Sequence, residues 1–159
     1  MAETSTAPET ITNEWAADFV ERWLAAWSSQ QPERVLELIT DDIVFHDSFW
    51  PQTMRGHAEV REYAEYLFRA FPDLVFESVG SPLVASDGPR AALLWHSSAT
   101  NTGPLDPPGM PATGKRYEGV VGAEFHEYRY GKVARLRVVF DMADIMRQLG
   151  LLPEVDSVG

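Results

Sequence analysis

The sequence has no cysteine, which excludes disulfide bonds, a thiolate nucleophile and a thiolate metal site, and makes a cytoplasmic protein the expectation. It also has no apolar run near the ~18 residues that a membrane span requires. Basic residues are few: 13 Lys and Arg stand against 24 Asp and Glu, for a formal net charge of −11. Because nucleic-acid phosphates need a basic surface, this deficit argues against a nucleic-acid partner.

Metal and cofactor signatures are absent as well. The four histidines show no His-x-His or Glu-x-x-His spacing, so no metal site is predicted. The sequence also lacks a glycine loop that would cradle phosphates and a dinucleotide-binding fingerprint. We therefore expect no cofactor.

What remains is an ordinary composition for one globular domain. The chain has 159 residues, of which 45% are hydrophobic, enough for a sizeable core. The first residues lack the basic and apolar regions of a signal peptide. We expect a disordered tail over residues 1–12, one domain over residues 13–153 and a short tail over residues 154–159.

The N-terminal third is predicted to be mainly helical. Asn13 is expected to cap a helix in which aromatic residues recur every four positions, which gives one aromatic face. That face either packs into the core or also walls a large apolar cavity. Pro32 opens a second short helix, and a third runs from about His57 to Ala70. The four aromatic residues are Trp15, Phe19, Trp23 and Trp27.

The rest of the sequence is predicted to be β-rich. A short strand over residues 43–48 precedes the third helix, and later strands cover residues 74–79, 91–100, 117–128 and 132–141. Residues 101–114 contain four prolines and three glycines and form a long irregular loop. We therefore predict an α+β fold in which a curved antiparallel sheet wraps over the N-terminal helices as a cone, with a pocket at its open end.

The strand over residues 132–141 carries the strongest candidate for chemistry. Side chains alternate between the two faces of a strand, so Arg137 and Asp141 share one face, and Leu136, Val138 and Phe140 share the other. A carboxylate near a cation suits a half-apolar pocket. The alternative is a surface role, in which Asp141 caps the short helix that follows it.

Several short motifs, in this order and spacing, resemble the SnoaL-like polyketide cyclases of the nuclear transport factor 2-like superfamily. The similarity covers roughly residues 13–153. The motifs are Asp41 to Asp47, Gly56 before a helix, Ala70 to Leu74, Thr100 to Pro104, Pro111 to Lys115, Gly131 to Val133, Phe140 to Asp141 and Gln148 to Gly150.

The resemblance implies a cofactor-independent enzyme that closes a ring by an intramolecular aldol reaction on a hydrophobic ketone or polyketide-like molecule. Asp141 would be the acid/base group, and His46 and Arg137 would position a carbonyl or a water. A similarity to limonene-type epoxide hydrolases is weaker, because Trp95 and Ser97 stand where those enzymes carry an Arg and an Asp.

Other chemistries on this fold also stay open. Ketosteroid isomerases carry their base near Asp47, but Trp23 would stand at the position of their oxyanion-hole Tyr, whose hydroxyl an indole lacks. A dehydratase, another isomerase or a ligand-binding module without chemistry are further alternatives.

The alternation of side chains leaves one question about the pocket undecided. His46 and Asp47 are neighbours in a strand, so only one of them faces the cavity unless the strand is bulged. In the strand over residues 91–100 we expect Trp95 and Ser97 inside and His96 outside. The substrate-binding candidates are Trp23, Phe19, Asp47, Ser48, Trp95, Ser97 and His126.

We also expect a homodimer. Curved sheets of this superfamily usually pair through the convex face. If that face carries Leu136, Val138 and Phe140, it presents an exposed apolar surface that a second copy of the chain would bury. The expected partners are thus a hydrophobic small molecule and a second copy of the chain.

Overall fold

The computed structural model describes residues 10–153. The predicted tails lie almost wholly outside these residues. Residues 10–12 precede the first helix, whose cap is Thr12: its side chain accepts a hydrogen bond from the Trp15 N–H at 3.0 Å. The predicted cap Asn13 is therefore wrong by one position. None of the described helices is long and apolar enough to cross a membrane.

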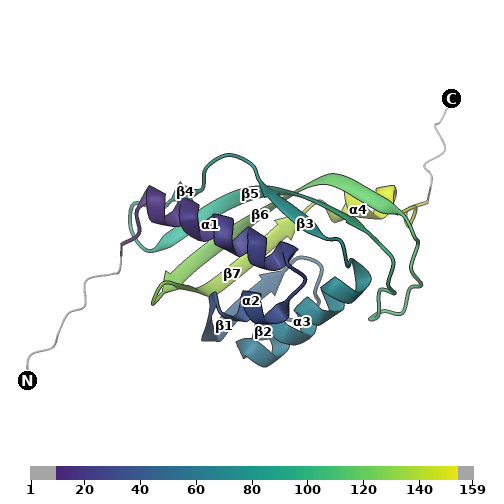
Figure 1. Ribbon diagram of the computed structural model, residues 1–159, viewed down its shortest axis with the longest axis horizontal. Coiled ribbons are helices and arrows are strands. Elements are labelled where there is room, and N and C mark those ends of the chain that lie inside the picture. The colour runs from purple at the N-terminus through teal and green to yellow at the C-terminus, as the bar shows by residue number, and fades with distance from the viewer. Residues whose placement is uncertain (1–9, 154–159) are drawn as a thin grey trace, which may run out of the picture.

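The elements follow the predicted order of helices, then strands, then a short helix (Figure 1). The helices are α1 (Asn13–Ser28), α2 (Pro32–Leu36), α3 (Gly56–Ala70) and α4 (Met142–Gln148). The strands are β1 (Ile39–Asp47), β2 (Met54–Arg55), β3 (Val75–Ser78), β4 (Leu83–Val84), β5 (Arg90–Thr100), β6 (Arg116–Arg129) and β7 (Lys132–Phe140).

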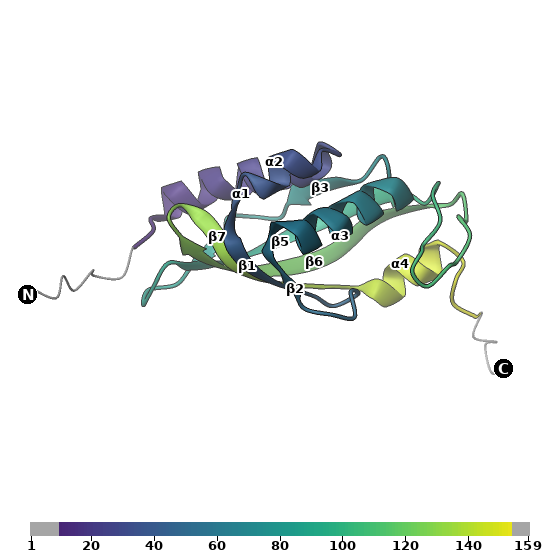
Figure 2. The ribbon, with the colours of Figure 1, turned by 90° about the horizontal axis from the view of Figure 1, so that it is seen from below.

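The strands form one curved sheet in the order β2-β1-β7-β6-β5-β3, with β4 paired to β5. Figure 2 shows α1, α2 and α3 on one side of this sheet and α4 beyond the end of β7. The predicted α+β fold is confirmed. The sheet is not wholly antiparallel, because β1 runs parallel to β7. These two strands are far apart in sequence, so no hairpin dictates their direction.

The helices decide which face of β7 is buried. Leu136 and Val138 are 1% and 5% exposed, whereas Val139 is 42% exposed and Arg137 also faces outward. The faces predicted for this strand are therefore reversed: the apolar set points toward the helices, where burial removes more apolar surface from water. Leu136, Val138 and Phe140 are not the convex surface.

The aromatic face of α1 serves both predicted purposes. Phe19 is fully buried and contacts the rings of His126 and Tyr128 on β6, so it belongs to the core. Trp27, two turns later, lies at the wall of a pocket. One helix thus holds the closed end of the cone together and lines its open end.

Candidate active site

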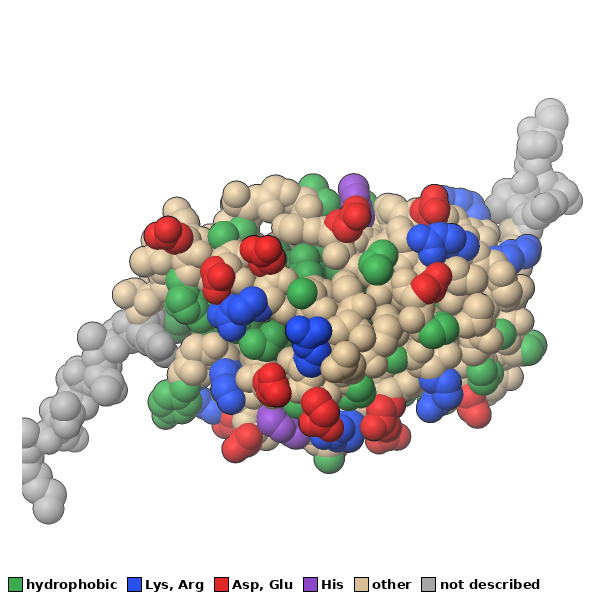
Figure 3. Space-filling model, in the orientation of Figure 1, with side chains coloured by type: hydrophobic (Ala, Val, Ile, Leu, Met, Phe, Trp, Pro, Cys, Tyr) green, Lys and Arg blue, Asp and Glu red, His purple; other side chains and the backbone are tan. Residues whose placement is uncertain are grey.

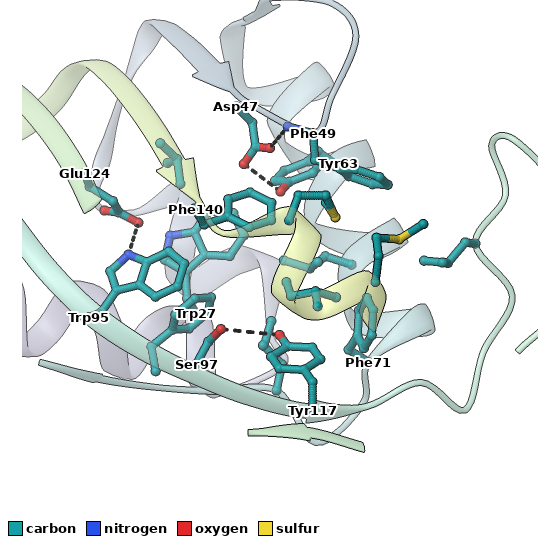
Figure 4. Close-up of a pocket in the computed structure, with 18 of the residues that line it drawn as sticks. Trp27, Asp47, Phe49, Tyr63, Phe71, Trp95, Ser97, Tyr117, Glu124 and Phe140 are labelled. Carbon is teal, nitrogen blue, oxygen red and sulfur yellow. Dashed lines mark hydrogen bonds between the residues drawn. The ribbon is translucent and has the colours of Figure 1, made fainter. Parts of the chain in front are cut away.

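The open end of the cone contains an apolar pocket (Figure 4). The space between its walls is ≈ 760 Å³, the mouth included. Twelve aromatic or polar side chains line it: Trp27, Phe45, Asp47, Phe49, Tyr63, Phe71, Phe76, Trp95, Ser97, Tyr117, Glu124 and Phe140.

Asp47, the last residue of β1, is one of two carboxylates that reach this pocket. Its Oδ2 accepts a hydrogen bond from the Tyr63 hydroxyl at 2.9 Å, and its Oδ1 accepts one from the Phe49 backbone N–H at 2.8 Å. Burial raises the pKa of Asp47 above its ordinary value, and the charge of Glu124 adds to the increase. The two hydrogen bonds act against this rise without cancelling it. Asp47 is therefore a carboxyl group that can gain or lose a proton nearer neutral pH.

Glu124, in the middle of β6, is the second carboxylate and is only 5% exposed. Its Oε2 accepts hydrogen bonds from Trp23 Nε1 at 2.7 Å and from His126 Nε2 at 2.7 Å. Its Oε1 accepts a longer one, 3.2 Å, from Trp95 Nε1. Three N–H donors on one carboxylate hold its position.

Strand pairing places the two carboxylates in one row across the sheet. Asp47 pairs with Val138 on β7, and Val138 pairs with Glu124 on β6. All three side chains line the pocket, and two strand spacings separate the outer Cα atoms by about 10 Å. A ligand lying over Val138 therefore has a carboxylate on either side.

Behind Glu124 the network continues into the core. The Nδ1 atom of His126 lies 2.9 Å from the hydroxyl of Tyr128, and His126 is 2% exposed. Burial raises the pKa of Tyr128, so its hydroxyl keeps its proton and donates to the imidazole. The imidazole can then carry a proton on Nε2, which donates to Glu124.

Hydroxyl groups complete the pocket opposite Asp47. Ser97 donates a weak hydrogen bond of 3.4 Å to the Tyr117 hydroxyl, which leaves the Tyr117 proton available to a ligand. Burial raises the pKa of Tyr117 to about 12, and burial together with Asp47 raises that of Tyr63 further. Both phenols are therefore neutral donors. Figure 4 shows Asp47 and Tyr63 on one side and Ser97 and Tyr117 on the other.

Residues from α4 and from the loop over residues 101–114 also line the pocket. Leu105 is the lining residue from the loop. The Gln148 side chain fixes α4 against β6, since it donates to the Glu118 carbonyl at 3.1 Å and accepts from the Glu118 N–H at 2.9 Å. The lining residues from α4 and its end are Met142, Ile145, Met146 and Leu149.

The pocket carries no positive side chain. Among the described residues that line it, the ionisable groups other than tyrosine are Asp47 and Glu124, and no Lys, Arg or His is present. Within residues 10–153 no three His, Asp or Glu side chains gather closely enough to hold a metal ion. The lining suits a neutral or cationic ligand better than an anionic one.

The structure does not bring the three predicted catalytic residues to this pocket. Asp141 is exposed, and its Oδ1 accepts the Asp144 N–H at 3.0 Å at the start of α4, as the helix-capping alternative described. His46 and Arg137 lie on the outer face of the sheet, where burial and the charge of Arg137 lower the pKa of His46. Ser48 is exposed beside them.

The structure places some of the predicted substrate-binding residues at the pocket. Trp95 and Ser97 face the pocket and His96 is exposed, as expected. Of the pair His46 and Asp47, Asp47 is the one that faces inward. The four other predicted residues have different positions. Asp47 lines the pocket, and Phe19 belongs to the core. Trp23 and His126 contact the pocket residue Glu124 through hydrogen bonds.

Sequence reasoning missed Glu124, Tyr63 and Tyr117 as site residues. A signal for Glu124 exists, because Glu124, His126 and Tyr128 alternate along one strand. It is obscured because the opposite face of the same strand carries Val121 and Phe125, which are 47% and 51% exposed. An apolar outer face makes the two sides of β6 hard to tell apart from sequence.

The comparisons with known proteins agree with this architecture. A family model for the SnoaL-like domain matches residues 20–136, most of the chain. The chain belongs to the SnoaL-like family. No protein of curated function matches it.

Similar solved structures share the fold over nearly the whole chain. AclR from Streptomyces galilaeus, described as a candidate hydroxylase, is 26% identical, with a TM-score of 0.75 and 92% of each chain covered. TsrD from Streptomyces laurentii is 22% identical, with a TM-score of 0.75 and 89% of this chain and 99% of TsrD covered. A candidate SnoaL-like polyketide cyclase from Jannaschia sp. CCS1 is 17% identical, with a TM-score of 0.74 and 96% and 100% covered.

Proposed function

We propose that this SnoaL-like protein is a cofactor-independent acid/base enzyme that closes a ring on a neutral hydrophobic ketone, with Asp47 as its acid/base group. The observation that carries the proposal is the position of Asp47: its carboxyl group lies in an aromatic pocket, held by Tyr63 and the Phe49 N–H, with a raised pKa. Asp47 thereby takes the role that the sequence resemblance suggested for Asp141.

Each step of an aldol closure has a group to perform it. The Asp47 carboxylate removes a proton α to a carbonyl, and the resulting carbanion attacks a second carbonyl of the same molecule. The carboxylic acid formed on Asp47 then returns that proton to the new alkoxide. The Tyr117 hydroxyl is placed to donate a hydrogen bond to a carbonyl oxygen as charge develops on it.

Glu124 assists this chemistry without exchanging a proton itself. Its three N–H donors hold the carboxylate in place, and its charge contributes to the raised pKa of Asp47. The aromatic walls exclude water, which strengthens both effects.

The proposal is tested by proton exchange, which needs no knowledge of the natural substrate. In D₂O, a base that removes α-protons from a hydrophobic ketone such as 1-tetralone introduces deuterium, which mass spectrometry counts. We expect the protein to accelerate this exchange. Asp47→Asn should lower the acceleration about 100-fold or more, as for the loss of a general base.

Asp141→Asn is the matched control. Asn caps helices as well as Asp does, so this variant should keep α4 in place and retain exchange within about twofold. The opposite outcome, loss with Asp141→Asn and survival with Asp47→Asn, would restore the assignment based on sequence resemblance and overturn ours.

The similarity to AclR favours hydroxylation as a second candidate function. Removal of the same α-proton would give a carbanion to which dioxygen adds, and protonation of the product gives a hydroperoxide. An external two-electron reductant would then convert the hydroperoxide to the alcohol and water. Oxygen uptake in step with product formation would support it, whereas ring closure without oxygen uptake supports the cyclase.

We also propose that the protein forms a homodimer through the outer face of the sheet. Leu94, Ala123 and Val139 form one row across β5, β6 and β7, and Val121 and Phe125 flank Ala123 along β6. The four larger side chains are 42% to 51% exposed. An apolar patch of this kind on the central strands favours burial against a second copy.

A further inference from the structure

Trp27 and Trp95 line the pocket and Trp23 contacts its Glu124, but the indole N–H groups of the three differ in one respect. Trp23 and Trp95 each donate to Glu124. Trp27 is 4% exposed, and its Nε1 atom is buried with no hydrogen-bond partner in the protein. Trp27 is also the tryptophan of α1 that lines the pocket. Figure 4 shows it near Trp95 among the aromatic rings of the pocket wall.

A buried N–H without an acceptor is unfavourable, because it has lost its hydrogen bonds to water. The neighbours of Trp27 supply no oxygen or nitrogen acceptor to this N–H: the ring makes T-shaped contacts with the aromatic rings of Trp23, Phe45, Tyr63 and Phe68. The nearby carboxylate of Glu124 already accepts three N–H donors. Trp27 lines the pocket, so a molecule bound there brings an acceptor to Nε1 once a neighbouring ring of the wall moves aside, because this atom itself has almost no accessible surface.

We propose that Trp27 Nε1–H donates a hydrogen bond to a carbonyl oxygen of the ligand, and that this bond selects a ketone over a hydrocarbon of the same shape. The inference rests on the proposed function for the ketone class. Trp27 would act beside the Tyr117 hydroxyl as a second donor in the pocket.

The charge of the pocket narrows the acceptor to a neutral one. A carboxylate or phosphate oxygen would also accept from Trp27, but it would enter a pocket that Asp47 and Glu124 make negative and that has no basic side chain among its described lining residues. Repulsion in an apolar pocket disfavours such a ligand. A ketone oxygen accepts hydrogen bonds and brings no charge.

The test uses two probes that differ in one oxygen, benzophenone and diphenylmethane. Benzophenone has no α-proton, so its binding is independent of the proposed proton transfer. Calorimetry measures the Kd of both probes for the wild-type protein and for Trp27→Phe, which keeps an aromatic ring and removes the N–H. The substitution should weaken benzophenone binding about 2- to 12-fold more than diphenylmethane binding, the range for one neutral hydrogen bond.

A spectrum of the unmutated protein tests the same bond directly. With ¹⁵N-labelled tryptophan, the Trp27 indole signal is assigned by its contacts to Phe45 and Tyr63. We expect benzophenone to move its proton resonance downfield and diphenylmethane not to do so. This measurement does not depend on whether Trp27→Phe folds.

Equal weakening of both probes, or an indole resonance that responds equally to both, would overturn the inference; so would failure of wild-type protein to bind benzophenone. The outcomes separate the two proposals. Oxygen-selective binding without α-proton exchange leaves the Trp27 inference standing and overturns the acid/base function. If α-proton exchange depends on Asp47 but Trp27→Phe weakens both probes equally, the acid/base function stands and the Trp27 inference is overturned.

Discussion

Two aspartates at the ends of neighbouring strands, Asp47 and Asp141, differ in their burial and in their role. Asp47 ends β1 and lines the pocket, where burial raises its pKa. Asp141 follows β7, is exposed, and caps α4. The chemistry of a carboxyl group depends on its surroundings, so the buried one is suited to proton transfer and the exposed one to holding the helix that walls the pocket.

The raised pKa of Asp47 predicts how its replacement changes stability with pH. The folded state binds the Asp47 proton more tightly than the unfolded state does. Protonation of Asp47 therefore stabilises the folded protein fully at pH values below the pKa that Asp47 has in the unfolded chain. This stabilisation is lost as the pH rises through the higher pKa that Asp47 has in the folded protein. Asn at this position does not ionise. The free energy of unfolding of Asp47→Asn relative to wild type should therefore increase with pH over that window, by about 1.4 kcal/mol for each unit of pKa shift.

Urea unfolding of both proteins at a series of pH values measures this difference. It should level off once Asp47 is fully ionised. A difference that stays constant from pH 4 to pH 8 would mean that Asp47 has an ordinary pKa, against the structure.

At this scale the sequence predicted part of the site. The alternation of β5 correctly placed Trp95 and Ser97 inside and His96 outside, because its inner and outer residues differ enough in polarity. For β1 the choice between His46 and Asp47 stayed open, since both are polar. Sequence cannot settle such a choice, because it depends on which face the helices cover.

At the scale of elements, β6 and β5 are fitted to each other around the network of Glu124. Gly122 on β6 leaves room for the Trp95 indole from β5: a Cβ atom at Gly122 would lie 2.2 Å from Cη2 of that ring. Trp95 is 3% exposed and has little space to move. The glycine therefore allows Trp95 to reach Glu124.

Gly122→Ala should accordingly destabilise the protein by about 1–3 kcal/mol, the usual effect of overpacking a core. It should also displace Trp95 from Glu124, which the indole fluorescence reports. Gly88→Ala is the control, because a Cβ there would meet only the Arg90 side chain at 3.9 Å and its effect should be within about 0.5 kcal/mol. Equal stabilities of the two variants would contradict the fit described here.

The order of elements was predictable from sequence because helical periodicity, strand alternation and turn residues are local signals. The faces of β7 were not. Both of its faces carry apolar residues, and Val139 on the outer face is as hydrophobic as Val138 on the inner one. The parallel pairing of β1 with β7 was equally out of reach, since it joins residues about ninety positions apart.

At the scale of the whole molecule, the two faces of the sheet differ. On the helical side, which Figure 3 shows, acidic, basic and hydrophobic side chains are interspersed. The outer face of the sheet instead groups Leu94, Val121, Phe125 and Val139 around Ala123. This contrast supports the proposal that the outer face is the dimer surface.

The proposed homodimer predicts that a charge introduced within this patch separates the two copies. We expect the wild-type protein to be a dimer by light scattering at micromolar concentration and Phe125→Asp to be a monomer, because an unpaired charge would be buried at the interface. Leu152→Asp, at an exposed apolar residue beyond α4, should leave the dimer intact. A monomeric wild-type protein would contradict the proposal.

The most direct test of the central claim, that Asp47 is the acid/base group, is the pH dependence of α-proton exchange measured beside the titration of the Asp47 carboxyl carbon by NMR. The exchange rate should rise with pH as Asp47 ionises, with the same midpoint as the carboxyl titration and above the ordinary aspartate value of about 3.9. Asp47→Asn should abolish this rise. A rate profile whose midpoint differs from the Asp47 titration, or one that persists in Asp47→Asn, would contradict the claim.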